Sequence, residues 1–140
     1  MSYIKLKNGT LITPFRSVRG GTVVLQDGII AGVHDRDVDV PDALELDVKG
    51  RYVAPGFIDI HVHGGGGHDF MDGTDTAFVK IAELHARYGT TSLVPTTLTA
   101  EKDDLLKTLD NYERATRKNR RGANLLGMHL EGPYFAMSQR

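Results

Sequence analysis

The sequence predicts an α/β protein, namely the beginning of a (β/α)8 barrel preceded by a small antiparallel β unit. First, apolar strand-like segments alternate with amphipathic helical segments from residue 53 onward, which is typical of parallel βαβ units. Second, two of these strands end in residues that can bind a metal, and α/β barrels carry their sites at C-terminal strand ends. Third, a complete barrel needs about 250 residues, whereas this chain has 140. We therefore expect the first three βα units of a longer polypeptide.

Residues 1–52 are predicted to form the N-terminal domain, made of short strands joined by tight turns. The dipeptides Asn8-Gly9 and Asp27-Gly28 are strong hairpin signals, because both residues of such a turn need positive φ. The polar segment 35–42 is predicted to be a loop, and no residue of this domain is a candidate for chemistry. The strands expected here are residues 3–7, 10–13, 22–26, 29–34 and 44–48.

Residues 53–140 are predicted to form the start of the catalytic barrel. A helix is expected from a cap at Asp72 or Thr74 to about Tyr88, and a second helix from a cap at Thr99. The strands expected between and around them are residues 57–63, 91–97 and 124–131.

Composition excludes several classes of protein. A net charge of -1 and 25% charged residues describe a globular protein with no reason to bind nucleic acid. The Arg/Lys cluster at residues 114–121 has no interleaved aromatic residues, so a solvated helix end is the better interpretation. No apolar run reaches about 18 residues, and the N-terminus lacks the basic and then apolar pattern of a signal peptide, so we expect a cytoplasmic protein without a membrane partner. Without cysteine, any metal must be held by histidine and carboxylate.

The segment from Phe57 to His63 carries the first candidate site, and its apolar, mostly β-branched residues predict a buried strand. Side chains on a strand alternate between faces, so Asp59, His61 and His63 are expected on one face. Two histidines two residues apart at a strand end can reach one metal ion, and four glycines follow them directly. A bare His-x-His motif is also compatible with ordinary structural histidines. His85, in the middle of a predicted helix, is interpreted as a packing residue.

The segment from Leu125 to Pro133 repeats this design. Gly127, His129 and Glu131 are expected on one face of an apolar strand that ends at Gly132-Pro133. Two neighbouring strands thus each end in a residue that can bind a metal, which favours a shared metal site over two unrelated structural motifs.

These motifs resemble a known family. Residues 56–63, GFIDIHVH, resemble the opening strand of the amidohydrolase superfamily. Residues 129–134, HLEGPY, are similar to the third-strand motif of one branch, the N-acetylglucosamine-6-phosphate deacetylases, and residues 64–73 and 89–96 fit the same branch. The resemblance runs over essentially the whole chain and covers about the first third of a family member.

The resemblance implies a metal-dependent deacetylase of amino-sugar catabolism that acts on a phosphorylated amino sugar. It implies a barrel with a small β-sandwich built from both chain ends, usually in a homodimer. His61, His63 and Glu131 match metal ligands for zinc or iron, as one or two ions. The strand position of Asp59 suits a residue that supports a ligand histidine, and His129 either has the same role or fills the barrel interior. The catalytic Asp and further histidine ligands are expected downstream, in the remainder of the same polypeptide.

Two alternatives stay open. Another C–N hydrolase of the superfamily, such as a cyclic-amide hydrolase, typically bridges its metals with a modified lysine on the fourth strand, whereas Glu131 lies on the third. The chain could instead be an inactive fragment that acts only by association. We expect residues 1–140 alone to be inactive.

Overall fold

The computed structural model describes residues 2–134 and 136–139 and divides into two compact units, residues 1–55 and 56–140. The boundary between the units lies between Pro55 and Gly56, three residues after the predicted boundary. The assignment of these units as domains stays a prediction. Within the described residues, no helix combines the length and the apolarity needed to cross a membrane.

The first unit is one five-stranded sheet in the order β3-β2-β1-β4, with β5 also paired to β1. β2 runs antiparallel to both of its neighbours, but β4 and β5 run parallel to β1. The predicted antiparallel unit is therefore mixed, because the loop at residues 35–43 crosses from β3 to the far side of β1, as a parallel pairing requires. The strands are β1 (Tyr3–Ile12), β2 (Ser17–Gln26), β3 (Ile29–His34), β4 (Leu44–Asp47) and β5 (Tyr52–Val53).

One of the two predicted hairpins is present. Asp27 and Gly28, with φ of 49° and 84°, join β2 to β3 as expected. The hairpin predicted at Asn8-Gly9 is wrong, because β1 continues through these residues. Asn8 has a φ of 59°, but here the positive φ accommodates an irregularity in the β1–β2 register. A dipeptide that favours positive φ suits a bulge as well as a turn.

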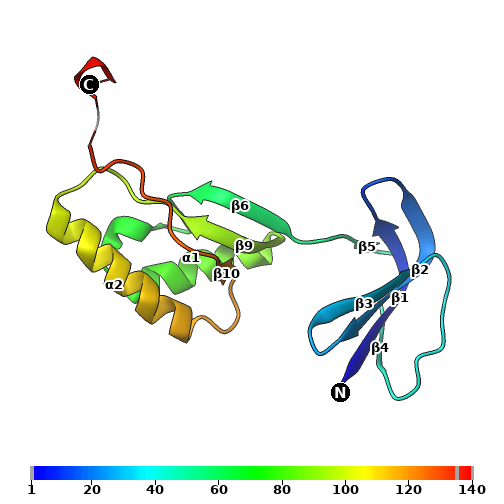
Figure 1. The fold of residues 1–140 in the computed structure, drawn as a ribbon. Coiled ribbons are helices and arrows are strands. Elements are labelled where there is room, and N and C mark those ends of the chain that lie inside the picture. The colour runs from blue at the N-terminus through cyan, green and yellow to red at the C-terminus, as the bar shows by residue number, and fades with distance from the viewer. Residues whose placement is uncertain (1, 135, 140) are drawn as a thin grey trace. The chain divides into compact units, whose positions relative to one another are not determined.

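The second unit is built from parallel βαβ crossovers, as predicted (Figure 1). Its three-stranded sheet has the order β10-β9-β6, and the helices α1 and α2 pack against each other and share one core with β9 and β10. The elements run in the order β6 (Phe57–Val62), α1 (Asp75–Arg87), β9 (Thr90–Pro95), α2 (Lys102–Lys118) and β10 (Asn124–Leu125).

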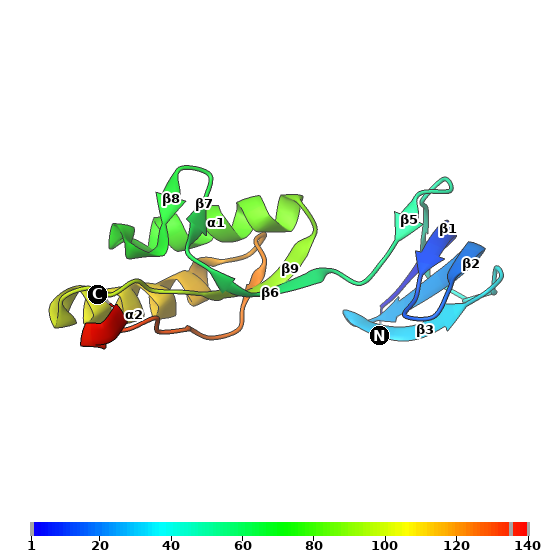
Figure 2. The ribbon, with the colours of Figure 1, turned by 90° about the horizontal axis from the view of Figure 1, so that it is seen from above.

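Smaller elements fill the connections of this unit. The glycine run after β6 forms a short hairpin of β7 (Gly64–Gly65) and β8 (His68–Asp69), which lies against α1 (Figure 2). The 3-10 turns are η1 (Phe70–Asp72) and η2 (Met137–Gln139).

One of the two predicted helix N-caps is present. Thr74 caps α1, since its Oγ1 accepts a hydrogen bond from the Ala77 N–H at 3.3 Å, as predicted. The cap predicted at Thr99 is wrong, because α2 begins at Lys102 and its N-cap residue, Glu101, makes no side-chain cap bond.

The core of the second unit fixes the strand ends. Phe78 and Ile81 of α1 are fully buried against Leu93 of β9, and the Phe70 ring lies 4.7 Å from the Phe78 ring.

The first strand of this unit is not buried. Ile58 and Ile60 of β6 are 64% and 72% exposed. The prediction of a buried first strand is wrong for the described residues, because β6 is an edge strand and none of the described elements covers these two side chains.

The third strand is shorter than the predicted 124–131 because a bulge interrupts it. Leu125 pairs with Leu93, but the next pair is His129 with Thr96, so residues 126–128 face only residues 94–95. Pro95 lies at this point and has no N–H to give to a regular ladder. The side-chain alternation expected from Leu125 to Glu131 is therefore broken, and the pairing of His129 sets the position of Glu131.

Candidate metal site

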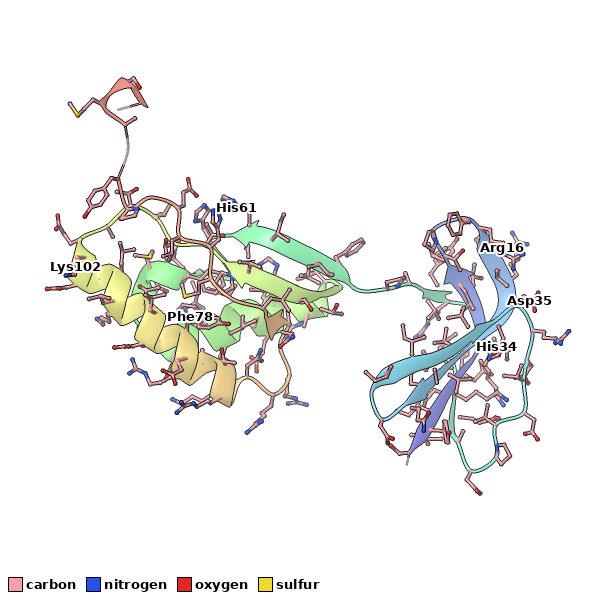
Figure 3. The ribbon with its side chains drawn as sticks, in the orientation of Figure 1. Arg16, His34, Asp35, His61, Phe78 and Lys102 are labelled. Atoms are coloured by element: carbon pink, nitrogen blue, oxygen red, sulfur yellow. The ribbon has the colours of Figure 1, made fainter. Side chains whose placement is uncertain are left out.

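Two histidines meet at the C-terminal end of β6. His61, labelled in Figure 3, is the penultimate residue of β6, and His63 follows its last residue. The contact between the two rings agrees with the shared face predicted from the two-residue period. Their Nε2 atoms are 3.3 Å apart. The sheet thus brings two ring nitrogens together at one point.

Glu131 reaches the same point from the segment after β10. The bridge between His129 and Thr96 ties this segment to the end of β9, through hydrogen bonds of 2.9 Å and 3.0 Å. Glu131 Oε2 lies 3.2 Å from the Nε2 atom of each histidine. The ligand atoms of all three predicted residues lie within 4.8 Å of one another.

Glu131 Oε2 has no hydrogen-bond donor among the described residues, although the atom itself is buried. A buried carboxylate oxygen without a donor or a counter-charge is costly. The two imidazole nitrogens that face it offset this cost only when a cation or a proton lies between them. The position of the carboxylate is thus compatible with a cation or a shared proton at this point.

A hydrogen bond to the backbone orients His63. Its Nδ1 lies 3.2 Å from the carbonyl oxygen of Thr96, and because a carbonyl can only accept, this hydrogen bond requires the tautomer with the proton on Nδ1. The neutral ring then presents the lone pair of Nε2 toward His61 and Glu131, as a metal ligand must. Sequence reasoning missed Thr96; the signal that could have found it is its place directly after the last residue of β9.

The donor atoms fit a small divalent cation. Bonds of about 2.0–2.2 Å at angles between octahedral and tetrahedral place donor atoms about 2.8–3.6 Å apart. The three separations here are 3.2, 3.2 and 3.3 Å. The three ligands from the described residues leave room for further ligands or for water on the same ion.

The other predicted residues surround this cluster in different ways. Asp59 Oδ1 accepts a hydrogen bond from the backbone N–H of His61 at 3.1 Å, so it braces the main chain of that residue. The His129 ring lies against the His61 ring, edge to face, with centroids 4.9 Å apart. His85 lies outside the cluster, with Nε2 3.3 Å from the carbonyl oxygen of Gly64, which agrees with the predicted packing role.

Comparison with known proteins identifies relatives of this chain, although no protein-family model matches it. It is 34% identical over 135 residues to the N-acetylglucosamine-6-phosphate deacetylase of Bacillus subtilis, an alignment that covers 94% of this chain and 34% of that protein. The chain is a homologue of the N-acetylglucosamine-6-phosphate deacetylases. The N-acetylgalactosamine-6-phosphate deacetylase of Escherichia coli O157:H7 is 36% identical over 111 residues, which are 79% of this chain and 28% of that enzyme.

A solved structure of such a deacetylase has the same fold. The N-acetyl-D-glucosamine-6-phosphate deacetylase of Mycobacterium smegmatis, as a D267A mutant in complex with N-acetyl-D-glucosamine-6-phosphate, superimposes with a TM-score of 0.77 at 29% identity. The alignment covers 97% of this chain and 34% of that structure. The chain therefore spans about a third of the length of the deacetylases that it matches.

Proposed function

We propose that the protein that carries this chain is a metal-dependent N-acetylglucosamine-6-phosphate deacetylase, which releases acetate and glucosamine 6-phosphate. The observation that carries the proposal is the convergence of His61, His63 and Glu131 in a chain whose relatives are deacetylases. The expected partners are the phosphorylated amino sugar, the remainder of the same polypeptide and a second subunit in a homodimer. The expected location is the cytoplasm.

In this proposal, His61 Nε2, His63 Nε2 and Glu131 Oε2 hold zinc or iron, as one or two ions. The bound metal would lower the pKa of a water molecule and polarise the amide carbonyl of the substrate. Glu131 supplies the negative charge of the site, and the Thr96 carbonyl keeps His63 in the tautomer that can bind. Asp59 and His129 support His61 from the backbone and from the ring. The acid–base Asp comes from the downstream polypeptide.

The proposed architecture is a (β/α)8 barrel in residues 53–140 and beyond, with residues 1–52 contributing to a β-sandwich. Both outer strands of the parallel sheet, β6 and β10, have an unpaired edge in the described chain. An apolar edge of this kind is a template for further strands. The exposed Ile58 and Ile60 side chains support the same extension, because barrel helices cover this type of surface.

The second candidate is another C–N hydrolase of the superfamily, such as a cyclic-amide hydrolase. Glu131, placed in contact distance of both histidines, argues for the deacetylase, because the cyclic-amide enzymes bridge their metals with a lysine on a later strand. Because one relative is an N-acetylgalactosamine-6-phosphate deacetylase, the assay must also compare the glucosamine and galactosamine forms of the substrate.

The test is an assay on the full-length gene product and, in parallel, on residues 1–140, each with added zinc or iron(II). The substrates are N-acetylglucosamine 6-phosphate, N-acetylgalactosamine 6-phosphate and a cyclic amide. We expect acetate release from the glucosamine substrate by the full-length protein, and none from residues 1–140. Ring opening of the cyclic amide without acetate release would contradict the proposal. Activity of residues 1–140 alone would contradict the need for downstream residues.

A further inference from the structure

We infer that Thr96 is a positioning residue that builds the metal site by locking His63 in its metal-binding tautomer and by tying all three strand ends together. The inference rests on the proposed metal site. It concerns a residue that contributes no ligand atom.

Thr96 is fully buried and makes three hydrogen bonds to the strand end that carries the histidines. Its N–H donates to the Val62 carbonyl at 2.8 Å, and its Oγ1 accepts from the Val62 N–H at 3.2 Å. Its carbonyl accepts from His63 Nδ1 at 3.2 Å. Two consecutive residues of the His-x-His motif are thus held by one threonine.

The Thr96 hydroxyl adds a side-chain link at a point where the pairing of β6 with β9 is irregular. The register shifts between Asp59 and Val62, and Val62 is paired with Pro95. Thr96 Oγ1 accepts a hydrogen bond from the Val62 N–H in this stretch and donates its own proton to the Val94 carbonyl at 3.3 Å. Without the hydroxyl, the Val62 N–H would lose this hydrogen bond beside the site.

The third strand is attached at the same point. Thr96 is bridged to His129, through hydrogen bonds that the Pro95 carbonyl and the Thr97 N–H on either side of it make to His129, and Glu131 lies two residues further along the chain. The histidine end of β6 and the glutamate segment after β10 are therefore both attached to the chain at Thr96 and its two neighbours. A shift of its backbone would move His63 and Glu131 relative to each other, so we expect metal affinity to depend on its side chain.

The experiment uses the full-length protein, three variants that test the inference and a fourth that assigns the signal. Thr96→Val removes the hydroxyl and keeps the shape, whereas Thr96→Ser keeps the hydroxyl. The matched control is Thr108→Val, because Thr108 is also buried and its hydroxyl donates to the Asp104 carbonyl at 2.9 Å, within α2. Histidine labelled with 15N in the ring reports the tautomer of His63 in the metal-free protein at pH 8, with the signal assigned by its loss in His63→Gln.

We expect the wild-type ring to carry its proton on Nδ1 and Thr96→Val to populate both tautomers. Zinc affinity, measured by competition with a chelator, should fall by about 10–100-fold in Thr96→Val, as for other residues that orient a ligand. Thr96→Ser and Thr108→Val should both behave as wild type.

Three results would overturn the inference. The first is a wild-type His63 with its proton on Nε2, which needs no variant to fold. The second is a Thr96→Val protein with unchanged tautomer and zinc affinity. The third is a Thr96→Ser protein as impaired as Thr96→Val, since the hydroxyl would then not be the cause. If the wild type has the Nδ1 tautomer and Thr96→Val loses it, but neither protein binds zinc, then the proposed function fails while the positioning role of Thr96 stands.

Discussion

The two units of the molecule are stabilised in different ways. Both units leave large apolar side chains exposed, but in the sheet unit the most buried cation, Lys5, lies between Asp37 at 2.9 Å and Glu45 at 2.8 Å. In the α/β unit, the aromatic rings of Phe70 and Phe78 and the side chain of Leu93 form a closed core. All three candidate metal ligands belong to the α/β unit.

The difference shows which unit can hold a precise site. A metal site needs side chains fixed by packing and by hydrogen bonds behind the ligands. The α/β unit provides both, because its core fixes β9 and Thr96 then fixes the neighbouring strand ends. The sheet unit presents an apolar surface around Ile29, Ile30 and Val33 that the described residues leave uncovered. We therefore expect substitutions in the α/β unit to affect metal binding and activity. Substitutions in the sheet unit should affect only the free energy of unfolding.

The largest effect is expected for Glu131→Gln in the full-length protein. The amide keeps the shape but loses the negative charge that holds the cation, so metal content and deacetylase rate should both fall by more than about 100-fold. Elemental analysis and an acetate assay measure the two quantities. Glu113→Gln, at an exposed ion pair with Arg117 on α2, is the matched control and should change neither. Normal metal content and normal rate in Glu131→Gln would remove Glu131 from the ligand set.

The next effect compares one substitution in the two units. Phe78→Ala empties a fully buried position and should lower the free energy of unfolding by about 3–5 kcal/mol. Phe15→Ala alters a side chain that is 95% exposed in the first unit and should change it by less than about 0.5 kcal/mol. Denaturant unfolding of both variants checks the contrast. Equal losses would mean that Phe15 is buried by residues outside the described chain.

A smaller effect is expected at Gly132, which follows Glu131. Gly132 has a φ of 99°, and a Cβ atom there would lie 2.5 Å from Thr99 Oγ1. Gly132→Ala should cost about 1–3 kcal/mol in backbone strain and should also weaken zinc binding, because the clash displaces Glu131. Gly67→Ala is the matched control, since Gly67 has a φ of 80° and open space around it. Equal zinc affinities of Gly132→Ala and Gly67→Ala would show that the clash with Thr99 does not displace Glu131.

The smallest effect concerns the ion pairs of the sheet unit. The hydrogen bond from Lys5, followed by that from Lys7, lowers the pKa of the Glu45 carboxyl below its usual value. A carboxyl with a lowered folded-state pKa stabilises the fold above the unfolded pKa of about 4.3, and this contribution is lost as the pH falls through the folded pKa. Glu45→Gln should therefore lower the unfolding temperature at pH 7 and converge with the wild type toward pH 3. If the unfolding temperatures of Glu45→Gln and the wild type differed equally at pH 7 and pH 3, the lowered pKa of Glu45 would not be the cause of the difference.

The sequence by itself determined the local periodicities. The alternation of strands and helices, the Thr74 cap, the Asp27-Gly28 turn and the shared face of His61 and His63 all follow from side-chain period and turn chemistry within a few residues. The type and spacing of the candidate ligands were likewise readable, because few residue types bind metals in a protein without cysteine.

Only the tertiary structure decided how these segments meet. Asn8-Gly9 became a bulge within β1 because the strand continued along β2, and local preference for positive φ does not distinguish the two outcomes. The shortened β10 and the bulge opposite Pro95 arose from pairing with a strand more than 30 positions earlier in the chain, as the pair Leu93 and Leu125 shows. Thr96 gained its place beside His63 through the same long-range pairing. Such contacts depend on register between strands distant in sequence, which no local pattern specifies.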